Sequence, residues 1–141
     1  MSSANDTIEL ALGSDLEHVP LVQLAVEGIT ALMGFDQETS FRIRLSVCES
    51  VINAIKHGNR YNPAKKVTVR FQLEKEQLVV SICDEGDGFS PDQILDPSVP
   101  ENLDRPNGRG ILLKKSFMDE VHFTRRAEGG MMVRLVKRLV P

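Results

Sequence analysis

The sequence predicts a two-layer α/β sandwich, in which a mostly antiparallel β-sheet is covered on one face by helices. Two consecutive stretches in the first half have the apolar spacing of helices, and two later stretches alternate apolar and polar residues as hairpins do. Antiparallel sheets commonly bury one face only, so the helices supply its cover. With 141 residues, the chain has the length of a single domain with one core.

The N-terminal part predicts one strand and one helix. Residues 8–12 alternate weakly in hydropathy, which predicts a short strand that ends at Gly13. Pro20 fits only a first helical turn, so the apolar-rich run up to Met33 predicts a helix that Gly34 closes.

A second helix is predicted from the capping residue Asp36 to a stop at Gly58. Apolar residues recur along it every three or four positions, as they do on the buried side of an amphipathic helix. These residues are Phe41, Leu45, Cys48, Ile52 and Ile55.

The rest of the chain predicts two hairpins, separated by a proline-rich stretch and a short helix. The expected elements are strands at 67–73 and 78–82 with a polar tip at 74–77, the proline-rich stretch at 91–106, a helix at 111–117, and strands at 121–124 and 131–139 that turn at Gly129 and Gly130.

Composition excludes several classes of protein. Hydrophobic residues make up 41% and charged residues 26%, which excludes collagen-like, mucin-like and largely disordered chains. The net charge of −3, without a polybasic stripe, argues against direct nucleic-acid binding. Neither a signal peptide nor an apolar run of about 20 residues is visible, so we expect a soluble cytoplasmic protein with no membrane contact. Cys48 and Cys83 lack metal-site spacing and are expected to be core thiols.

The first of three polar clusters lies at residues 49–58, at the end of the second predicted helix. Glu49, Asn53 and His57 are spaced by four, so they project from one side of a helix. A carboxylate one turn before a carboxamide can hold a hard cation beside a reacting hydroxyl, and Mg²⁺ prefers such oxygen ligands. The alternative is a solvated helix edge with a capping histidine.

The second cluster, Asp84 with two glycines, directly follows an apolar strand. Asp84 is in phase with Val80 and Ile82, so we expect its carboxylate to point toward the core face. A buried carboxylate needs a partner, and an adenine amine is one candidate. Gly86 and Gly88 would let the backbone approach a flat base. The alternative is a tight turn in which both glycines need positive φ.

The third cluster is a glycine-rich loop at 107–111 that runs into the predicted helix. Free amides at a helix start attract anions, and Arg105 and Arg109 would add charge-assisted bonds to phosphate. A Gly-x-Gly loop alone is a weak signal. In this order, however, the three clusters indicate a nucleotide pocket.

Together these clusters resemble the ATPase and kinase superfamily that includes DNA gyrase, a heat-shock chaperone, histidine kinases and the mismatch-repair protein MutL. Its ATP-binding domain is called the Bergerat fold. Residues 49–58 are similar to its N box, 84–89 to its first glycine box and 108–110 to its second. The resemblance implies a single histidine-kinase-like ATP-binding domain over 1–141, with an ATP lid at about 89–107.

Within that superfamily, a chain of this size that holds the fold alone is most similar to the bacterial anti-sigma-factor serine/threonine kinases of partner-switching systems. Histidine kinases normally carry a dimerising helix with a phospho-accepting histidine upstream, and only a short segment precedes the first predicted helix here. The resemblance implies ATP and Mg²⁺, a sigma factor as partner and an anti-anti-sigma protein as the phosphorylated antagonist. It also implies a homodimer, which such relatives often form.

The resemblance further implies roles for single residues. Glu49 would be the general base for a serine or threonine hydroxyl, Asn53 would ligate Mg²⁺, and Asp84 would bind the adenine amine. The remaining nucleotide contacts would come from Lys56, His57, Gly86, Gly88, Arg105, Gly108, Arg109 and Gly110.

Three alternatives stay open at this point. One is a nucleotide-gated protein-binding switch without significant phosphoryl transfer, and another is a detached histidine-kinase catalytic domain. The third is a globular domain with no nucleotide site. The presence of Glu49 favours a working kinase over a binding switch.

Overall fold

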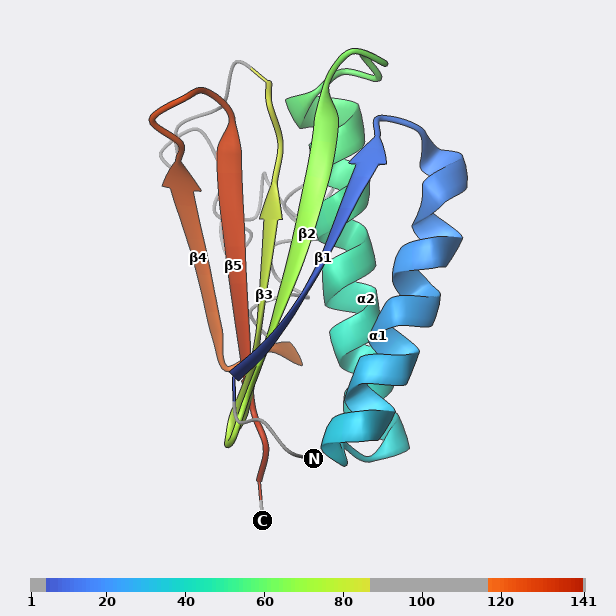
Figure 1. Ribbon diagram of the computed structural model, residues 1–141, viewed down its shortest axis with the longest axis vertical. Coiled ribbons are helices and arrows are strands. Elements are labelled where there is room, and N and C mark those ends of the chain that lie inside the picture. The colour runs from blue at the N-terminus through green and yellow to red at the C-terminus, as the bar shows by residue number, and fades with distance from the viewer. Residues whose placement is uncertain (1–4, 87–116, 141) are drawn as a thin grey trace, which may run out of the picture.

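A computed structural model of the protein describes residues 5–86 and 117–140, which form a five-stranded sheet with two helices (Figure 1). All neighbouring strands pair antiparallel, in the order β1-β2-β3-β5-β4. The strands are β1 (Asn5–Gly13), β2 (Lys66–Glu74), β3 (Gln77–Cys83), β4 (Glu120–Arg125) and β5 (Met131–Arg138). The predicted hairpins are confirmed, while the predicted proline-rich stretch and residues 111–116 of the predicted helix lie outside the described residues.

The first helical unit forms where local sequence signals place it. A short 3-10 turn, η1 (Leu16–His18), leads into α1 (Val19–Met33), and Pro20 occupies the first turn of α1. Gly34 ends the helix with φ of 92°, a left-handed conformation that favours glycine.

The second helical unit is α2 (Gln37–Asn53) followed by η2 (Ala54–Gly58), a single π-helical turn. The Asp36 carboxylate accepts the N–H of Thr39 at 2.7 Å, so the predicted N-cap is confirmed. The regular helix ends five residues before the predicted stop, because the chain changes from α to π geometry at Ala54.

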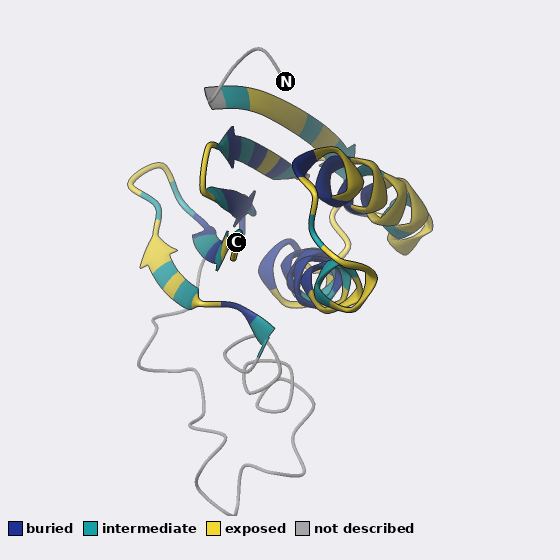
Figure 2. Ribbon diagram, turned by 90° about the horizontal axis from the view of Figure 1, so that it is seen from below, coloured by how far each residue is buried: buried dark blue, intermediate teal, exposed yellow. Residues whose placement is uncertain are grey.

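Both helices lie on the same side of the sheet, and the core fills the space between the two layers (Figure 2). Alternate residues of β2 and β3 point into this core, including Phe71, Leu73 and Ile82. The alternation predicted for these strands is therefore confirmed, and so is the two-layer sandwich. Among the residues that the structure describes, neither helix is long and apolar enough to cross a bilayer.

The predicted buried side of the second helix is correct at Cys48 and Ile55, which lie in the core, and wrong at Phe41 and Leu45. Ile43, Val47 and Val51 are fully buried, whereas Phe41 and Leu45 are 48% and 40% exposed. Residues spaced by four follow one face of a helix, and α2 carries two such apolar rows. Because only one row can face the sheet and α1, the packing of the two layers decides which is buried.

The two cysteines lie on opposite sides of the sheet. Cys48 is in the core, where burial raises the pKa of its thiol to about 11. Cys83 follows the core residue Ile82, so it faces the uncovered side of the sheet and is only partly buried. The expectation that both are core thiols is thus correct for Cys48 and wrong for Cys83.

Candidate functional site

The end of β3 holds a buried carboxylate, Asp84, which is 3% exposed. Its Oδ1 accepts the N–H of Gly86 at 3.0 Å and the N–H of Met131 at 3.1 Å. Burial raises the pKa of this carboxyl, while the two N–H donors and the charge of Arg126 partly offset that effect. The phase argument predicted a carboxylate that points toward the core face, and Asp84 Oδ2 borders Gly58 at the end of the helical layer.

Three glycines from separate segments surround Asp84, and we call them the glycine clamp: Gly58, Gly86 and Gly130. A Cβ on Gly58 would lie 2.3 Å from Asp84 Oδ2, and one on Gly130 would lie 2.1 Å from the Asp84 carbonyl oxygen. A Cβ on Gly86 would lie 1.9 Å from the carbonyl oxygen of Gly58. None of these positions can hold a side chain without moving backbone or the carboxylate.

The glycine clamp also corrects one alternative reading of the sequence. Within the part of the chain that the structure describes, the glycines with positive φ are Gly34, Gly129 and Gly130, and Gly86 is not one of them. Gly86 is therefore required for close contact with Gly58 rather than for a left-handed turn.

The N-box residues lie on the helical unit that ends at the glycine clamp. Glu49 and Asn53 are one turn apart on α2, as their spacing predicts, and both are partly exposed. Within residues 5–86 and 117–140, neither side chain makes a hydrogen bond or an ion pair. Lys56 and His57 are exposed on η2, where a π-turn has a wider repeat than the predicted α-helix.

The π-turn brings the N box to the Asp84 turn. Its backbone bond runs from the N–H of Asn59 to the carbonyl of Ala54 at 2.8 Å, one residue longer than an α-helical bond. The turn ends with Gly58 in contact with Asp84 and Gly86. The first two predicted clusters are therefore adjacent in space.

The third predicted cluster cannot be placed in the same way. The residues concerned, and the predicted lid at 89–107, lie outside the described residues. They are Arg105, Gly108, Arg109 and Gly110, and Gly88 of the second cluster also lies outside the described residues.

Two polar side chains at the site were not predicted from the sequence. Arg126, in the β4–β5 turn, donates from Nη1 to the Asp84 carbonyl oxygen at 2.6 Å. Asn59, just past η2, is 2% exposed and accepts the N–H of Glu85 at 2.8 Å. Both contacts join residues far apart in the chain, so no local pattern could have indicated them.

The Asp84 carboxylate has a second oxygen that is able to accept a hydrogen bond from a ligand. Among the described residues, both hydrogen bonds to the Asp84 carboxylate go to Oδ1, and Oδ2 borders the side-chain-free Gly58. An exocyclic amine is a suitable donor for that second oxygen.

A divalent cation would find few protein ligands here. The described residues contain no cluster of three or more His, Cys, Asp or Glu side chains that could hold a metal. The Asn53 amide oxygen could supply one ligand, and this suits Mg²⁺, which commonly keeps water and phosphate oxygens as its other ligands.

Comparison with known proteins gives a consistent result over nearly the whole chain. The profile of the histidine kinase-like ATPase domain matches residues 12–137. Serine-protein kinase RsbW of Bacillus velezensis is 30% identical over 99% of this chain and 89% of its own length. The proteins of the same name from Bacillus subtilis and Staphylococcus aureus (strain JH9) are each 29% identical, over 99% and 97% of this chain and 89% of their own.

Proposed function

The chain belongs to the histidine kinase-like ATPase domain family, and from this premise we propose that it is an ATP-dependent serine/threonine protein kinase. The single observation that carries the proposal is the buried Asp84 carboxylate within the glycine clamp, beside the helical unit that bears Glu49 and Asn53. The serine-protein kinases that match almost the full chain support protein hydroxyl groups as acceptors.

In this proposal Asp84 selects the adenine base. The exocyclic amine of adenine donates to the Asp84 carboxylate, Gly86 keeps the Asp84 turn in contact with Gly58, and Gly88 lets the base approach the backbone. A buried hydrogen bond to an ionised group contributes about 1.5–3 kcal/mol, enough to discriminate adenine from a base that lacks the amine.

Glu49 and Asn53 serve the transfer step. Glu49 accepts the proton of the substrate hydroxyl as that oxygen bonds to the γ-phosphorus, and the bond from the γ-phosphorus to the bridging oxygen breaks to release ADP. The partial exposure of Glu49 leaves its carboxylate accessible to a protein substrate. Mg²⁺, bound by Asn53 and phosphate oxygens, would neutralise phosphate charge.

The other proposed contacts lie around the phosphates. Lys56 and His57 are exposed on η2 and so can reach an anionic ligand. The remaining phosphate contacts are assigned to Arg105, Gly108, Arg109 and Gly110, on the basis of the sequence alone.

We also propose that the kinase acts as an anti-sigma factor, which binds a sigma factor and phosphorylates its anti-anti-sigma antagonist in the cytoplasm. Exposed leucines on α1 support a protein partner: Leu21, Leu24 and Leu32 are 53%, 65% and 62% exposed. A homodimer is part of the proposal, and its test is the molar mass of the purified protein in solution.

The experiment that tests the kinase is transfer of labelled phosphate from Mg-ATP to a candidate antagonist. We expect acid-stable label on serine or threonine, and we expect Glu49→Gln to keep ATP affinity but lose transfer. Unchanged transfer by Glu49→Gln would remove Glu49 from the role of base.

Two other results would replace this proposal. Binding of ATP and partner without any transfer would indicate a nucleotide-gated switch. Acid-labile label on a histidine would indicate a detached histidine-kinase domain.

A further inference from the structure

We propose that Asn59 is a positioning residue, which orients the Asp84 carboxylate toward the base of the nucleotide. The inference rests on the proposed function, because it assigns a purpose to Asn59 only if Asp84 binds adenine. Asn59 lies outside the N-box and glycine-box residues that the sequence pattern identified.

The Asn59 side chain is almost fully buried and makes three hydrogen bonds. Its Oδ1 accepts the N–H of Glu85 at 2.8 Å, and its Nδ2 donates to Ser14 Oγ at 2.9 Å and to the Lys66 carbonyl oxygen at 3.1 Å. Only one orientation of the amide fits, because Glu85 offers a donor and Lys66 an acceptor.

These bonds act on the peptide unit that joins Asp84 to Glu85. Asn59 holds the N–H of this unit from one side, and Arg126 Nη1 holds its carbonyl oxygen from the other at 2.6 Å. A peptide unit is planar, so hydrogen bonds at both of its polar groups restrict its rotation. The direction of the Asp84 side chain, which leaves the adjacent Cα, is thereby restricted.

A second bond anchors the same turn to the start of β2. The N–H of Lys66 donates to the Glu85 carboxylate, while the Lys66 carbonyl accepts from Asn59. The side chains of Asn59 and Glu85 therefore bind the carbonyl oxygen and the N–H of Lys66, respectively. The Asp84 turn is fixed relative to β2 as well as to η2.

The chain next to Asn59 holds an unfavourable backbone conformation. Arg60 and Tyr61 follow it with φ of 52° and 60°, the left-handed region that non-glycine residues seldom adopt. Backbone bonds span this turn, from the N–H of Tyr61 to the Ile55 carbonyl oxygen at 2.9 Å and from the N–H of Asn62 to the Asn59 carbonyl oxygen at 3.0 Å, and the buried Asn59 side chain anchors its start.

The test compares the affinities of the full chain for ATP and inosine triphosphate, whose base carries an oxygen in place of the amine. We expect the unmodified protein to prefer ATP. In Asn59→Ala, a less restricted Asp84 should lower the affinity for ATP roughly five- to tenfold, the loss of about one hydrogen bond, and leave that for inosine triphosphate nearly unchanged. The ratio of the two affinities does not depend on the folded fraction, because both nucleotides bind the same folded molecules.

Two further variants make the comparison specific. Asn59→Ser, which is smaller and still polar, should lower the ratio in the same direction if Asn59→Ala fails to fold. Ser14→Ala is the matched control: it removes one Asn59 partner but leaves the bond to Glu85, so it should lower the melting temperature and keep the wild-type ratio.

The outcomes separate the two proposals. If Asp84→Asn binds ATP as the unmodified protein does, the proposed function fails. If Asp84→Asn loses ATP while the Asn59 variants keep the wild-type ratio, or lose both nucleotides equally, only the positioning role is overturned.

Discussion

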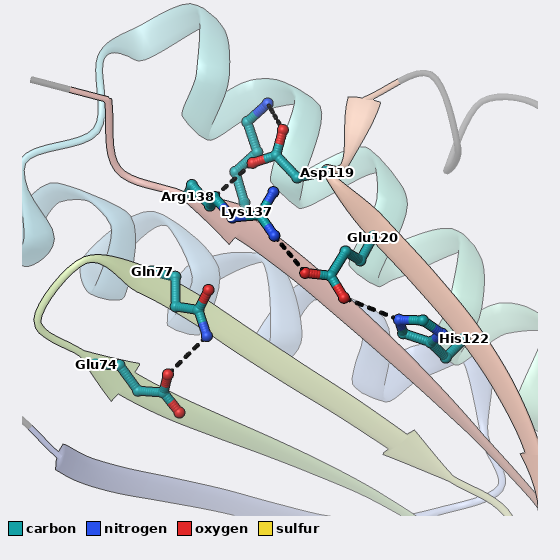
Figure 3. A network of polar contacts seen from close by, with 7 residues as sticks. All are labelled: Glu74, Gln77, Asp119, Glu120, His122, Lys137 and Arg138. Carbon is teal, nitrogen blue, oxygen red and sulfur yellow. Dashed lines mark hydrogen bonds and ion pairs between the residues drawn. The ribbon is translucent and has the colours of Figure 1, made fainter.

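Acidic side chains lie in opposite environments at the two ends of the β3–β5 strand pair. At one end, Asp84 is buried and accepts backbone N–H groups. At the other end lies an outer network of exposed or partly exposed side chains (Figure 3). We define this outer network by its members Asp119, Glu120, His122, Lys137 and Arg138.

The pKa shifts at the two ends differ in sign. A hydrogen bond from His122, with the charge of Arg138, lowers the pKa of the partly exposed Glu120. Burial raises the pKa of Asp84 in spite of its hydrogen bonds. A folded chain gains little from exposed ion pairs but loses stability when it buries a charge, so a carboxylate kept at the Asp84 position points to a ligand rather than to stability.

Of the variants that test this comparison, Gly86→Ala is expected to change the stability of the protein most. The added Cβ would meet the Gly58 carbonyl oxygen at 1.9 Å, and backbone cannot move away as easily as a side chain. We expect a loss of about 3 kcal/mol in the free energy of unfolding, measured by urea denaturation. Gly28→Ala is the control, since its Cβ meets nothing within 4 Å on exposed α1, and it should stabilise by about 0.5–1 kcal/mol.

The next largest effect is expected from Asp84→Asn. Loss of the charged acceptor should weaken ATP binding by about 1.5–3 kcal/mol, or roughly ten- to 150-fold, in calorimetry. The neutral amide oxygen can still accept both N–H groups, so the free energy of unfolding at pH 7 should stay equal or rise. Lower stability together with retained ATP affinity would contradict both halves of this prediction.

The dependence of stability on pH tests the direction of the Asp84 pKa shift. The pKa of Asp84 in the folded state is raised above 3.8, so the folded protein holds this proton more strongly than the unfolded chain does. The contribution of Asp84 to stability is therefore largest below pH 3.8 and is lost as the pH rises through the folded-state pKa. Subtracting the urea-derived stabilities of Asp84→Asn from those of the unmodified protein should reveal this falling profile, and a rising difference would contradict it.

The smallest effect is expected in the outer network. Glu120→Gln removes the ion pair to Arg138, which water already screens, and changes the hydrogen bond to His122. Its urea midpoint should shift less than that of Gly86→Ala, and the shift should vanish at about 1 M salt. A salt-independent loss of stability as large as that of Gly86→Ala would contradict the proposed difference between the two ends.

The features that could be predicted from the sequence are those set by local physics. Asp36 caps α2 and Gly34 ends α1 because each acts on its own backbone neighbours. The burial of Asp84 follows from its phase along one strand. Each of these inferences needs only a few consecutive residues.

The remaining features depend on how distant segments meet. Gly58 and Gly130 were predicted as a helix stop and a turn, but each also fits against Asp84. Asn59 and Arg126 bind a peptide unit far from them in the chain. Their roles could not be predicted because neither belongs to a spaced pattern.

The place of β1 in the sheet has a consequence for the order of folding. β2–β3 and β4–β5 are joined by short turns, whereas β1 reaches β2 only after both helices, so that Gly13 pairs with Lys66. Closing that long loop costs more conformational entropy than closing a hairpin turn, so we expect β1 to pair with β2 more slowly than the hairpins form. During translation β1 leaves the ribosome before its neighbour β2, and its unpaired edge is open to chaperone capture or misassembly in that interval.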